Sequence, residues 1–449
     1  MSFFRGGKGA TPTNAEEPLL GPVGGPVGGP VGGPVGGPVG GTGGGSPAPP
    51  GTYRRSGPLG SLKNAVRPLT HPEKRKERLI KGAQTGNLEM VKQALNDGAD
   101  IEANPFDYDR LIRQGITPLH HACINGHLDV VRELLKRGAA MGPGPLLSAT
   151  NNNHLDIVRE LLSGEGHPGA LIDATDYEGG PTPLHNACRW GYLEMVRELL
   201  SGEGHPGAAI EIRDSDGCTP LFTAARHGHL EVVRELLSGK GHKGAAVDAA
   251  NNNGATPLFI ASERGHVEIV RELLSGEGHQ GAAVDAATNY GQTPLHIASE
   301  WGHLEVVREL LSGEGHQGAA VDAAAQAGVT PLMLASARNQ LKVVRELLSG
   351  EGHPGALIDA ATTDGTTSLY IASQHGREAV VKELLSGEGH KAATVKKGGI
   401  FSKSPLSVAA SLKIKELLKQ AMSESATGGR RRRYTYAKGT RRNKKTRRH

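Results

Sequence analysis

A histidine recurs at the end of a repeated ten-residue segment, VRELLSGEGH, and is the first candidate for chemistry in this sequence. The recurring residues are His167, His205, His242, His279, His316, His353 and His390. Imidazole binds metals and titrates near pH 6.5, so such a ladder could hold metal ions or act as a charge switch. Zinc needs ligands at about 2 Å, whereas packed helices lie about 8–10 Å apart. We therefore expect solvated loop residues and no metal site.

Catalytic and nucleotide-binding motifs are absent from the sequence. H-E-x-x-H, G-x-S-x-G and G-x-x-x-x-G-K-[ST] do not occur, and the abundant glycine fits loop turns better than a phosphate cradle. The cysteines Cys123, Cys188 and Cys218 lack C-x-x-C spacing, so we expect reduced, buried side chains. These observations favour a non-enzymatic protein with no catalytic residues and no cofactor.

Basic residues gather at the ends of the chain. Residues 430–449 contain 11 Lys or Arg and no acid, whereas residues 79–429 carry 30 basic and 42 acidic residues, a net charge of −12. Such a tail can neutralise phosphates and stack on bases, carry an import signal for a nuclear import receptor, contact the acidic middle, or only keep the chain soluble. The sequence leaves these four readings open. The tail residues concerned are Arg430, Arg431, Arg432, Arg433, Tyr434, Tyr436, Arg441, Arg442, Lys444, Lys445, Arg447 and Arg448.

The N-terminal segment is rich in Gly and Pro. GPVG is written five times from Gly21 to Gly40; its period of four excludes collagen, and its composition cannot bury enough surface to fold. The first residues, MSFFRGGKGA, lack the apolar stretch of a signal peptide, and no run is long enough to span a membrane. We therefore expect residues 1–72 and 423–449 to be disordered. We also expect an intracellular monomer, cytoplasmic or nuclear and not secreted, without membrane contact.

Residues 73–422, between these ends, form a repeat array. TPL begins at Thr182, Thr219, Thr256, Thr293 and Thr330, always 37 residues apart. In each copy the Thr can cap a helix and the Pro suits the first helical position. A glycine follows, and then a second helix with an apolar stripe of Leu and Val. Neither short helix is stable alone, so the copies must stack side by side.

The pattern T-P-L-H-x-A followed by G-H-L-E-V-V-x-E-L-L resembles the ankyrin repeat. The resemblance covers roughly 350 of the 449 residues in about ten copies. It implies an all-α ankyrin-repeat solenoid of stacked helix-turn-helix units with finger loops, flanked by disordered tails. It also implies that the histidines of the T-P-L-H and Gly-His motifs are structural. The third copy, Pro145 to Leu162, starts only 27 residues after the second, so we expect a missing finger near residues 139–144.

Positions that vary between copies are candidates for partner contact, because constant positions serve stacking. In proteins that the chain resembles, finger tips and exposed first-helix positions line the concave surface that binds partners. Trp and Arg are enriched in binding hot spots, although the two indoles could instead pack against a neighbouring loop. The matching residues are Tyr177, Asp216, Asn252 and Tyr290 at the finger tips, and Arg189, Trp190, Arg226, His227, Glu263, Arg264, Glu300, Trp301 and Arg338 at the ends of the first helices.

The expected function is therefore that of a scaffold or adaptor that binds an unidentified protein partner through the concave face and finger tips. An alternative is a nucleic-acid-associated protein, whose basic tail contacts DNA or RNA while the array recruits a partner. A spacer without a dedicated partner is a third reading. Binding through the tail should weaken with rising salt, which separates the first two readings.

Overall fold

The structure, a computed structural model, describes residues 71–104, 116–165, 167, 169–276, 278–313, 315–387, 390–395 and 404–425. All of them belong to one compact unit, residues 67–449. The segments expected to be disordered lie outside the described residues, except that residues 71–72 and 423–425 are helical. The helical array therefore extends slightly beyond the expected limits of 73–422.

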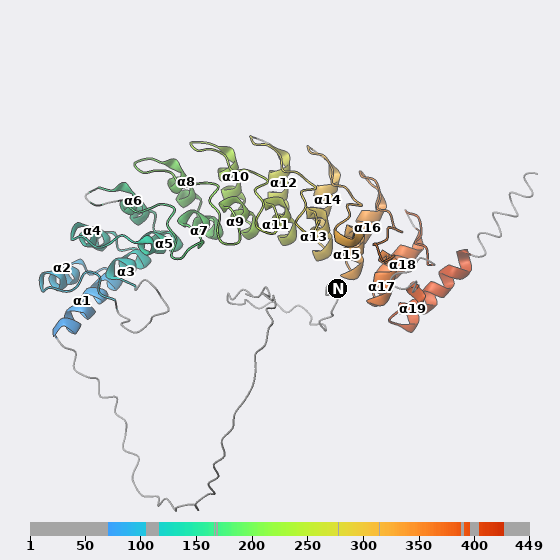
Figure 1. Cartoon of the computed structure of the whole chain (residues 1–449), viewed down its shortest axis with the longest axis horizontal. Coiled ribbons are helices and arrows are strands. Elements are labelled where there is room, and N and C mark those ends of the chain that lie inside the picture. The colour runs from blue at the N-terminus through green and yellow to red at the C-terminus, as the bar shows by residue number, and fades with distance from the viewer. Residues whose placement is uncertain are drawn as a thin grey trace, which may run out of the picture. The chain divides into compact units, whose positions relative to one another are not determined.

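Helix pairs repeat along the array, with odd-numbered helices in an inner row and even-numbered helices in an outer row (Figure 1). The inner row contains α1 (His71–Thr85), α3 (Pro118–Asn125), α5 (Pro143–Asn151), α7 (Pro183–Trp190), α9 (Pro220–His227), α11 (Pro257–Arg264), α13 (Pro294–Trp301), α15 (Pro331–Ala337), α17 (Ser368–Gln374) and α19 (Pro405–Val408). The outer row contains α2 (Leu88–Asn96), α4 (Leu128–Lys136), α6 (Leu155–Ser163), α8 (Leu193–Ser201), α10 (Leu230–Ser238), α12 (Val267–Ser275), α14 (Leu304–Ser312), α16 (Leu341–Ser349) and α18 (Glu378–Ser386); residues 412–425 are also helical. The expected all-α solenoid is confirmed.

Threonine and proline define the start of the inner helices. At α7 the Oγ1 of Thr182 accepts the backbone N–H of His185 at 3.4 Å, and the backbone N–H of Thr182 donates to Nδ1 of His185 at 3.3 Å. Pro183 occupies the first turn, where its missing N–H costs no intrahelical hydrogen bond. This reciprocal cap satisfies two backbone donors at the helix start and explains why T-P-L-H recurs.

The core is a continuous row of small aliphatic contacts. In α10, Val232, Val233, Leu236 and Leu237 are at most 3% exposed, and Leu221 of the paired helix α9 is fully buried. Each such Leu contributes about 1.5–3 kcal/mol by leaving water. Since every copy contains the same stripe, each repeat presents the same apolar face to its neighbour.

Charged residues on the outer helices pair across repeats. Nε of Arg234 lies 2.8 Å from Oε2 of Glu272 in the next outer helix, and its Nη1 lies 2.9 Å from Oε1 of Glu231 in its own helix. The equivalent cross-repeat pair recurs from Arg132–Glu160 to Arg345–Glu383. Each pair is solvent-exposed on the Arg side and individually weak, and the series links each outer helix from α4 to α16 to the next one.

A second cross-repeat hydrogen bond closes the C-terminal end of the inner helices from α1 to α15. Nε2 of His303 lies 2.9 Å from the carbonyl oxygen of Glu263 in the preceding repeat. In other repeats His, Tyr, Gln or Arg at this position contacts the equivalent carbonyl. The preceding inner helix ends at Arg264 and is capped by Gly265, whose φ of 75° is left-handed and whose lack of a Cβ leaves room for the imidazole ring. These groups satisfy a carbonyl that the helix end leaves unpaired.

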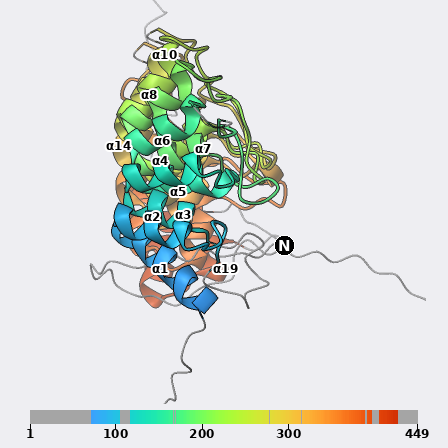
Figure 2. The same cartoon turned by 90° about the vertical axis from the view of Figure 1, so that its left-hand side faces the viewer.

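The connections between repeats project from one side of the helical rows (Figure 2). Successive fingers are joined by main-chain hydrogen bonds, such as the one from the Asn252 N–H to the Asp216 carbonyl at 3.0 Å. The third pair, α5 and α6, is folded in register, with Leu146 and Leu147 buried. Only residues 137–142 separate α4 from α5, whereas residues 202–219 separate α8 from α9. The missing finger is therefore confirmed.

Candidate partner-binding surface

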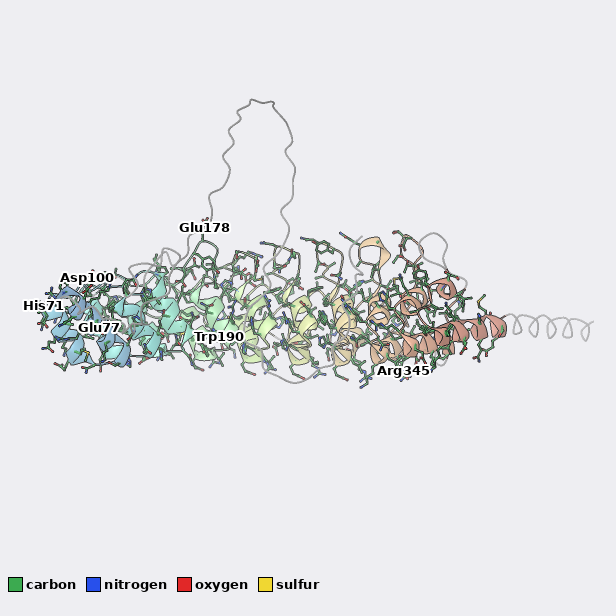
Figure 3. All side chains as sticks on the ribbon, turned by 90° about the horizontal axis from the view of Figure 1, so that it is seen from below. His71, Glu77, Asp100, Glu178, Trp190 and Arg345 are labelled. Atoms are coloured by element: carbon green, nitrogen blue, oxygen red, sulfur yellow. The ribbon has the colours of Figure 1, made fainter. Side chains whose placement is uncertain are left out.

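The residues expected to contact a partner fall into two rows, one at each end of the inner helices. Glu178, in a finger, lies at one edge of the array, and Trp190, at the end of α7, lies well away from that edge (Figure 3). Eight helical residues separate the two ends of α7, which corresponds to about 12 Å. We call the residues in the last two positions of α7, α9, α11 and α13, together with Arg338, the helix-end row. The finger tips form the other row.

Two exposed indoles mark the helix-end row. Trp190 is 46% exposed and Trp301 is 56% exposed, and both occupy the last position of their helix. The next residue in each case is a glycine that ends the helix, so the indole stands at a corner of the inner row. About half of each ring therefore packs on the array and about half faces solvent, which leaves area for a partner.

Charges in the helix-end row are only partly compensated. Nη2 of Arg338 lies 2.6 Å from Oε1 of Glu300 in the preceding repeat, so these two predicted contact residues neutralise each other. Among the described residues, no carboxylate lies within 4.0 Å of the guanidinium groups of Arg189, Arg226 or Arg264, and all three side chains are exposed. The row thus carries unpaired arginines at α7, α9 and α11, and the half-buried Glu263 beside Arg264 offsets the net charge only at α11.

His227 lies within this positive region. Burial lowers the pKa of His227, and the nearby guanidinium groups of Arg189 and Arg226 lower it further, against a hydrogen bond with the Thr223 carbonyl that raises it. The imidazole is therefore neutral at pH 7. It contributes a polar ring near Arg189 and Arg226 rather than another charge.

The finger-tip row combines exposed aromatic rings with residues used for stacking. Tyr177 is 62% exposed and Tyr290 is 53% exposed. Asn252, in contrast, donates its side-chain amide to the Ser215 carbonyl of the previous finger at 3.0 Å. The tyrosines are free to contact a partner, whereas Asn252 also positions its own finger.

Two exposed leucines were not predicted as candidate contact residues from the sequence. Leu171 is 79% exposed and Leu357 is 65% exposed, and both occupy the same position of the loop after the outer helix. Ala209 and Ala246 stand there in neighbouring copies. The change from a small to a large apolar side chain was the available signal, but it lies in a segment whose other residues largely recur between copies.

The recurring histidines of the GEGH segments are not solvated, contrary to expectation. Nδ1 of His242 lies 2.9 Å from the carbonyl oxygen of the next residue, and Nε2 of His279 lies 3.2 Å from the Glu272 carbonyl at the end of α12. The side chain of His390 is only 8% exposed. The loop folds back so that the ring covers the last turn of the outer helix. This half-buried packing role explains the repetition.

The T-P-L-H histidines are structural, as the resemblance implied. Nε2 of His185 lies 3.0 Å from the Cys218 carbonyl in the next repeat, while Nδ1 faces the Thr182 N–H and hydroxyl. A carbonyl can only accept, so Nε2 carries the hydrogen and the ring is neutral. Burial is the main cause that lowers the pKa of His185, and it lowers the pKa of His120 to about 4.

Reactive groups are not gathered into a site within the described part of the chain. No group of three or more His, Cys, Asp or Glu side chains there could hold a metal ion. Cys123, Cys188 and Cys218 are free and buried, and burial raises the pKa of the Cys218 thiol to about 11. None of the described helices is both long and apolar enough to cross a membrane. The basic tail from Arg430 onward lies outside the described residues.

Known proteins with this architecture match the array. The ankyrin repeat domain of Bcl-3, described as a unique member of the IkappaB protein family, is 28% identical, with a TM-score of 0.44; the match covers 54% of this chain and 99% of that one. The human ASB11 ankyrin repeat domain is 27% identical, with a TM-score of 0.45, covering 54% and 97%. Comparison with the curated proteins finds no match. The family model for ankyrin repeats in three copies matches residues 79–176, 146–248, 242–322 and 316–397, and the chain therefore belongs to the ankyrin repeat family.

Proposed function

We propose that this protein is a non-enzymatic scaffold or adaptor that binds a protein partner through its helix-end row, assisted by the finger tips. Ankyrin repeats are general protein–protein interaction modules, and their extended concave surfaces bind partners. The proposal goes further by naming the residues of this chain. The observation that carries it is the exposure of Trp190 and Trp301 in equivalent positions of an otherwise buried inner helix.

The burial pattern separates stacking residues from candidates for binding. In α13, residues from Pro294 to Ser299 are buried, Glu300 is half-buried and Trp301 is exposed. A large aromatic side chain left half in water gives up part of its possible hydrophobic stabilisation. Burial of this surface by a partner would recover that free energy, and Trp is the residue type most enriched where partners bind tightly.

Affinity capture from nuclease-treated cell extract tests the proposal. The bait is the full-length chain, compared with the double variant Trp190→Ala/Trp301→Ala. We expect the variant to lose its specific partners, because truncating a central Trp typically costs about 2 kcal/mol or more, which is roughly 30-fold in Kd. The matched control is Leu171→Ala/Leu357→Ala, which removes two exposed apolar side chains from the other loop surface.

A chain ending at Thr427 separates the proposal from its alternative. Partners that remain after removal of the tail, and after nuclease treatment, are bound by the array. Capture that disappears with the tail or with nuclease would instead favour the nucleic-acid-associated protein, whose binding should also fall steeply with salt. Equal capture by all array variants would contradict the assignment of the helix-end row.

A further inference from the structure

Three arginines on successive inner helices form a basic patch, consisting of Arg189, Arg226 and Arg264. They belong to α7, α9 and α11, and the patch is flanked by Trp190 at one end and Trp301 at the other. The residues from 79 to 429 carry a net charge of −12. A positive region on the inner row of such an array is therefore a local reversal of sign.

Among the described residues, the arginines of the basic patch differ from those of the outer helices in having no carboxylate partner. On the outer helices, each VREL-type arginine from Arg159 to Arg345 lies within 2.8 Å of a glutamate in the next repeat. Within the described ranges, the guanidinium groups of the basic patch have no carboxylate within 4.0 Å. On the outer helices, the arginines that link stacked repeats form ion pairs with glutamates. Arginines without such a pair, in positions that vary between copies, therefore need an explanation other than stacking.

The spacing of the patch fits a polypeptide that crosses the inner helices. Packed helices lie about 8–10 Å apart, so Trp190 and Trp301, three helices apart, are separated by about 25–30 Å. In an extended, polyproline-like segment every third residue lies on one face at a step of about 9 Å. Carboxylates three residues apart could therefore meet Arg189 and Arg226, which occupy equivalent positions of α7 and α9. Arg264 lies one position later in α11, so its carboxylate partner would be displaced from that spacing.

Charge complementarity favours an acidic polypeptide over a nucleic acid. Affinity for a nucleic acid depends on many contacts between basic residues and phosphates. A nucleic acid lying along this acidic array would meet mostly negative charge and be repelled. Three arginines, with the Glu263 carboxylate beside them, offer too few basic contacts for a nucleic acid. A short acidic segment needs only a local match, and Arg pairs with carboxylates through two parallel hydrogen bonds.

We infer that the basic patch binds an acidic segment of a partner protein, with an apolar residue of that segment on Trp190 or Trp301. The inference rests on the proposed function and adds the chemical class of the partner. Carboxylates supply recognition and on-rate, while the indoles supply buried area. Phosphorylated residues in the partner are not required.

Selection from a displayed library of random twelve-residue peptides tests this inference with the full-length chain. We expect enriched peptides to carry a net negative charge, with acidic residues three positions apart and at least one large apolar residue. The Kd of each enriched peptide is then measured by fluorescence anisotropy. The charge-reversal variant Arg189→Glu/Arg226→Glu/Arg264→Glu should weaken binding at least about tenfold.

The matched control reverses three exposed lysines on the loops, Lys240→Glu/Lys243→Glu/Lys391→Glu. It makes the same change in net charge, and glutamate already stands at the position of Lys240 in other copies. This control should bind the peptides with a Kd close to that of the unchanged chain. An equal loss in both triple variants would attribute the effect to net charge and overturn the inference.

Further outcomes distinguish failure of the inference from failure of the proposed function. Neutral or basic peptides whose binding depends on Trp190 and Trp301 would overturn the acidic partner and leave the proposed function standing. Enriched peptides indifferent to every change in the helix-end row would overturn both. Displacement of a bound peptide by an oligothymidylate, lost in the charge-reversal variant, would assign the patch to nucleic acid and overturn the inference.

Discussion

Replacement of Gly265 by alanine tests how strictly one repeat constrains the next. Gly265 has φ of 75°, and a Cβ built there would lie 2.6 Å from Nδ1 of His303 in the following repeat. The ring would have to move, and its 2.9 Å contact with the Glu263 carbonyl would break. We expect Gly265→Ala to cost about 1 kcal/mol for the left-handed backbone and about 1–2 kcal/mol more for the lost hydrogen bond and its displaced acceptor.

Gly241→Ala is the matched control, because it isolates the backbone term. Gly241 has φ of 79°, but nothing lies within 4 Å of its added Cβ, so only about 1 kcal/mol should be lost. Urea unfolding followed by far-UV circular dichroism compares the two variants under the same conditions. A second measurement places Gly265→Ala in a His303→Ala background, where the excess cost should vanish. Equal costs for Gly241→Ala and Gly265→Ala, or no coupling to His303, would refute the steric account.

Two further predictions concern buried polar groups. Ser299→Ala should raise the urea midpoint, with a gain of about 1 kcal/mol in the free energy of unfolding, because the buried Oγ of Ser299 has no hydrogen-bond partner among the described residues. Ser373→Ala should lower the urea midpoint by a similar amount, because the Ser373 hydroxyl donates to the Leu369 carbonyl at 2.7 Å. Shifts of the midpoint in the same direction for both variants would contradict this assignment of the two hydroxyls. Burial lowers the pKa of His185, so the unfolded chain binds more protons below pH 6.5 and stability should fall from pH 7.5 to pH 5. The variant His185→Phe introduces the residue that already stands at the equivalent position of α9, Phe222. It should reduce the loss of stability between pH 7.5 and pH 5, measured by urea unfolding at the two pH values. An unchanged loss would exclude His185 as a cause.

Local chemistry made most of the fold predictable from the sequence. The helix starts at Pro294 and Leu304 follow from the cap at Thr293, the glycine at Gly302 and the apolar stripe, and α13 and α14 begin at those residues. Each of these signals acts within about four residues of its own position. The 37-residue period then extends the same result along the array.

Features that depend on the distance between repeats were not predictable. The pairing of Arg234 with Glu272 spans 38 residues, and VRELL alone does not say whether its arginine pairs within its own helix or with the next. The expectation that His279 is solvated was wrong for a related reason, because its loop folds back onto the end of α12. In the candidate site, exposure of Trp190 followed from its variable position, whereas the neutralisation of Arg338 by Glu300 required the structure.

The repeats are nearly identical, but they are not interchangeable, because each one is fitted to its predecessor. At six inner-helix ends that carry glycine, from Gly86 to Gly302, the next repeat places His or Gln against it, whereas Gly376 near the C-terminal end of the array faces Ala410. Where the left-handed residue is Asn153 or Asn339 instead, an added Cβ would collide with that imidazole. The next repeat then carries Tyr192 or Arg377, each of which still reaches the same inner-helix carbonyl. A longer side chain can approach that carbonyl around the asparagine. Exchanging two repeats should therefore separate matched partners at their borders. Variation between copies is tolerated at positions that face solvent, such as the half-exposed Trp190.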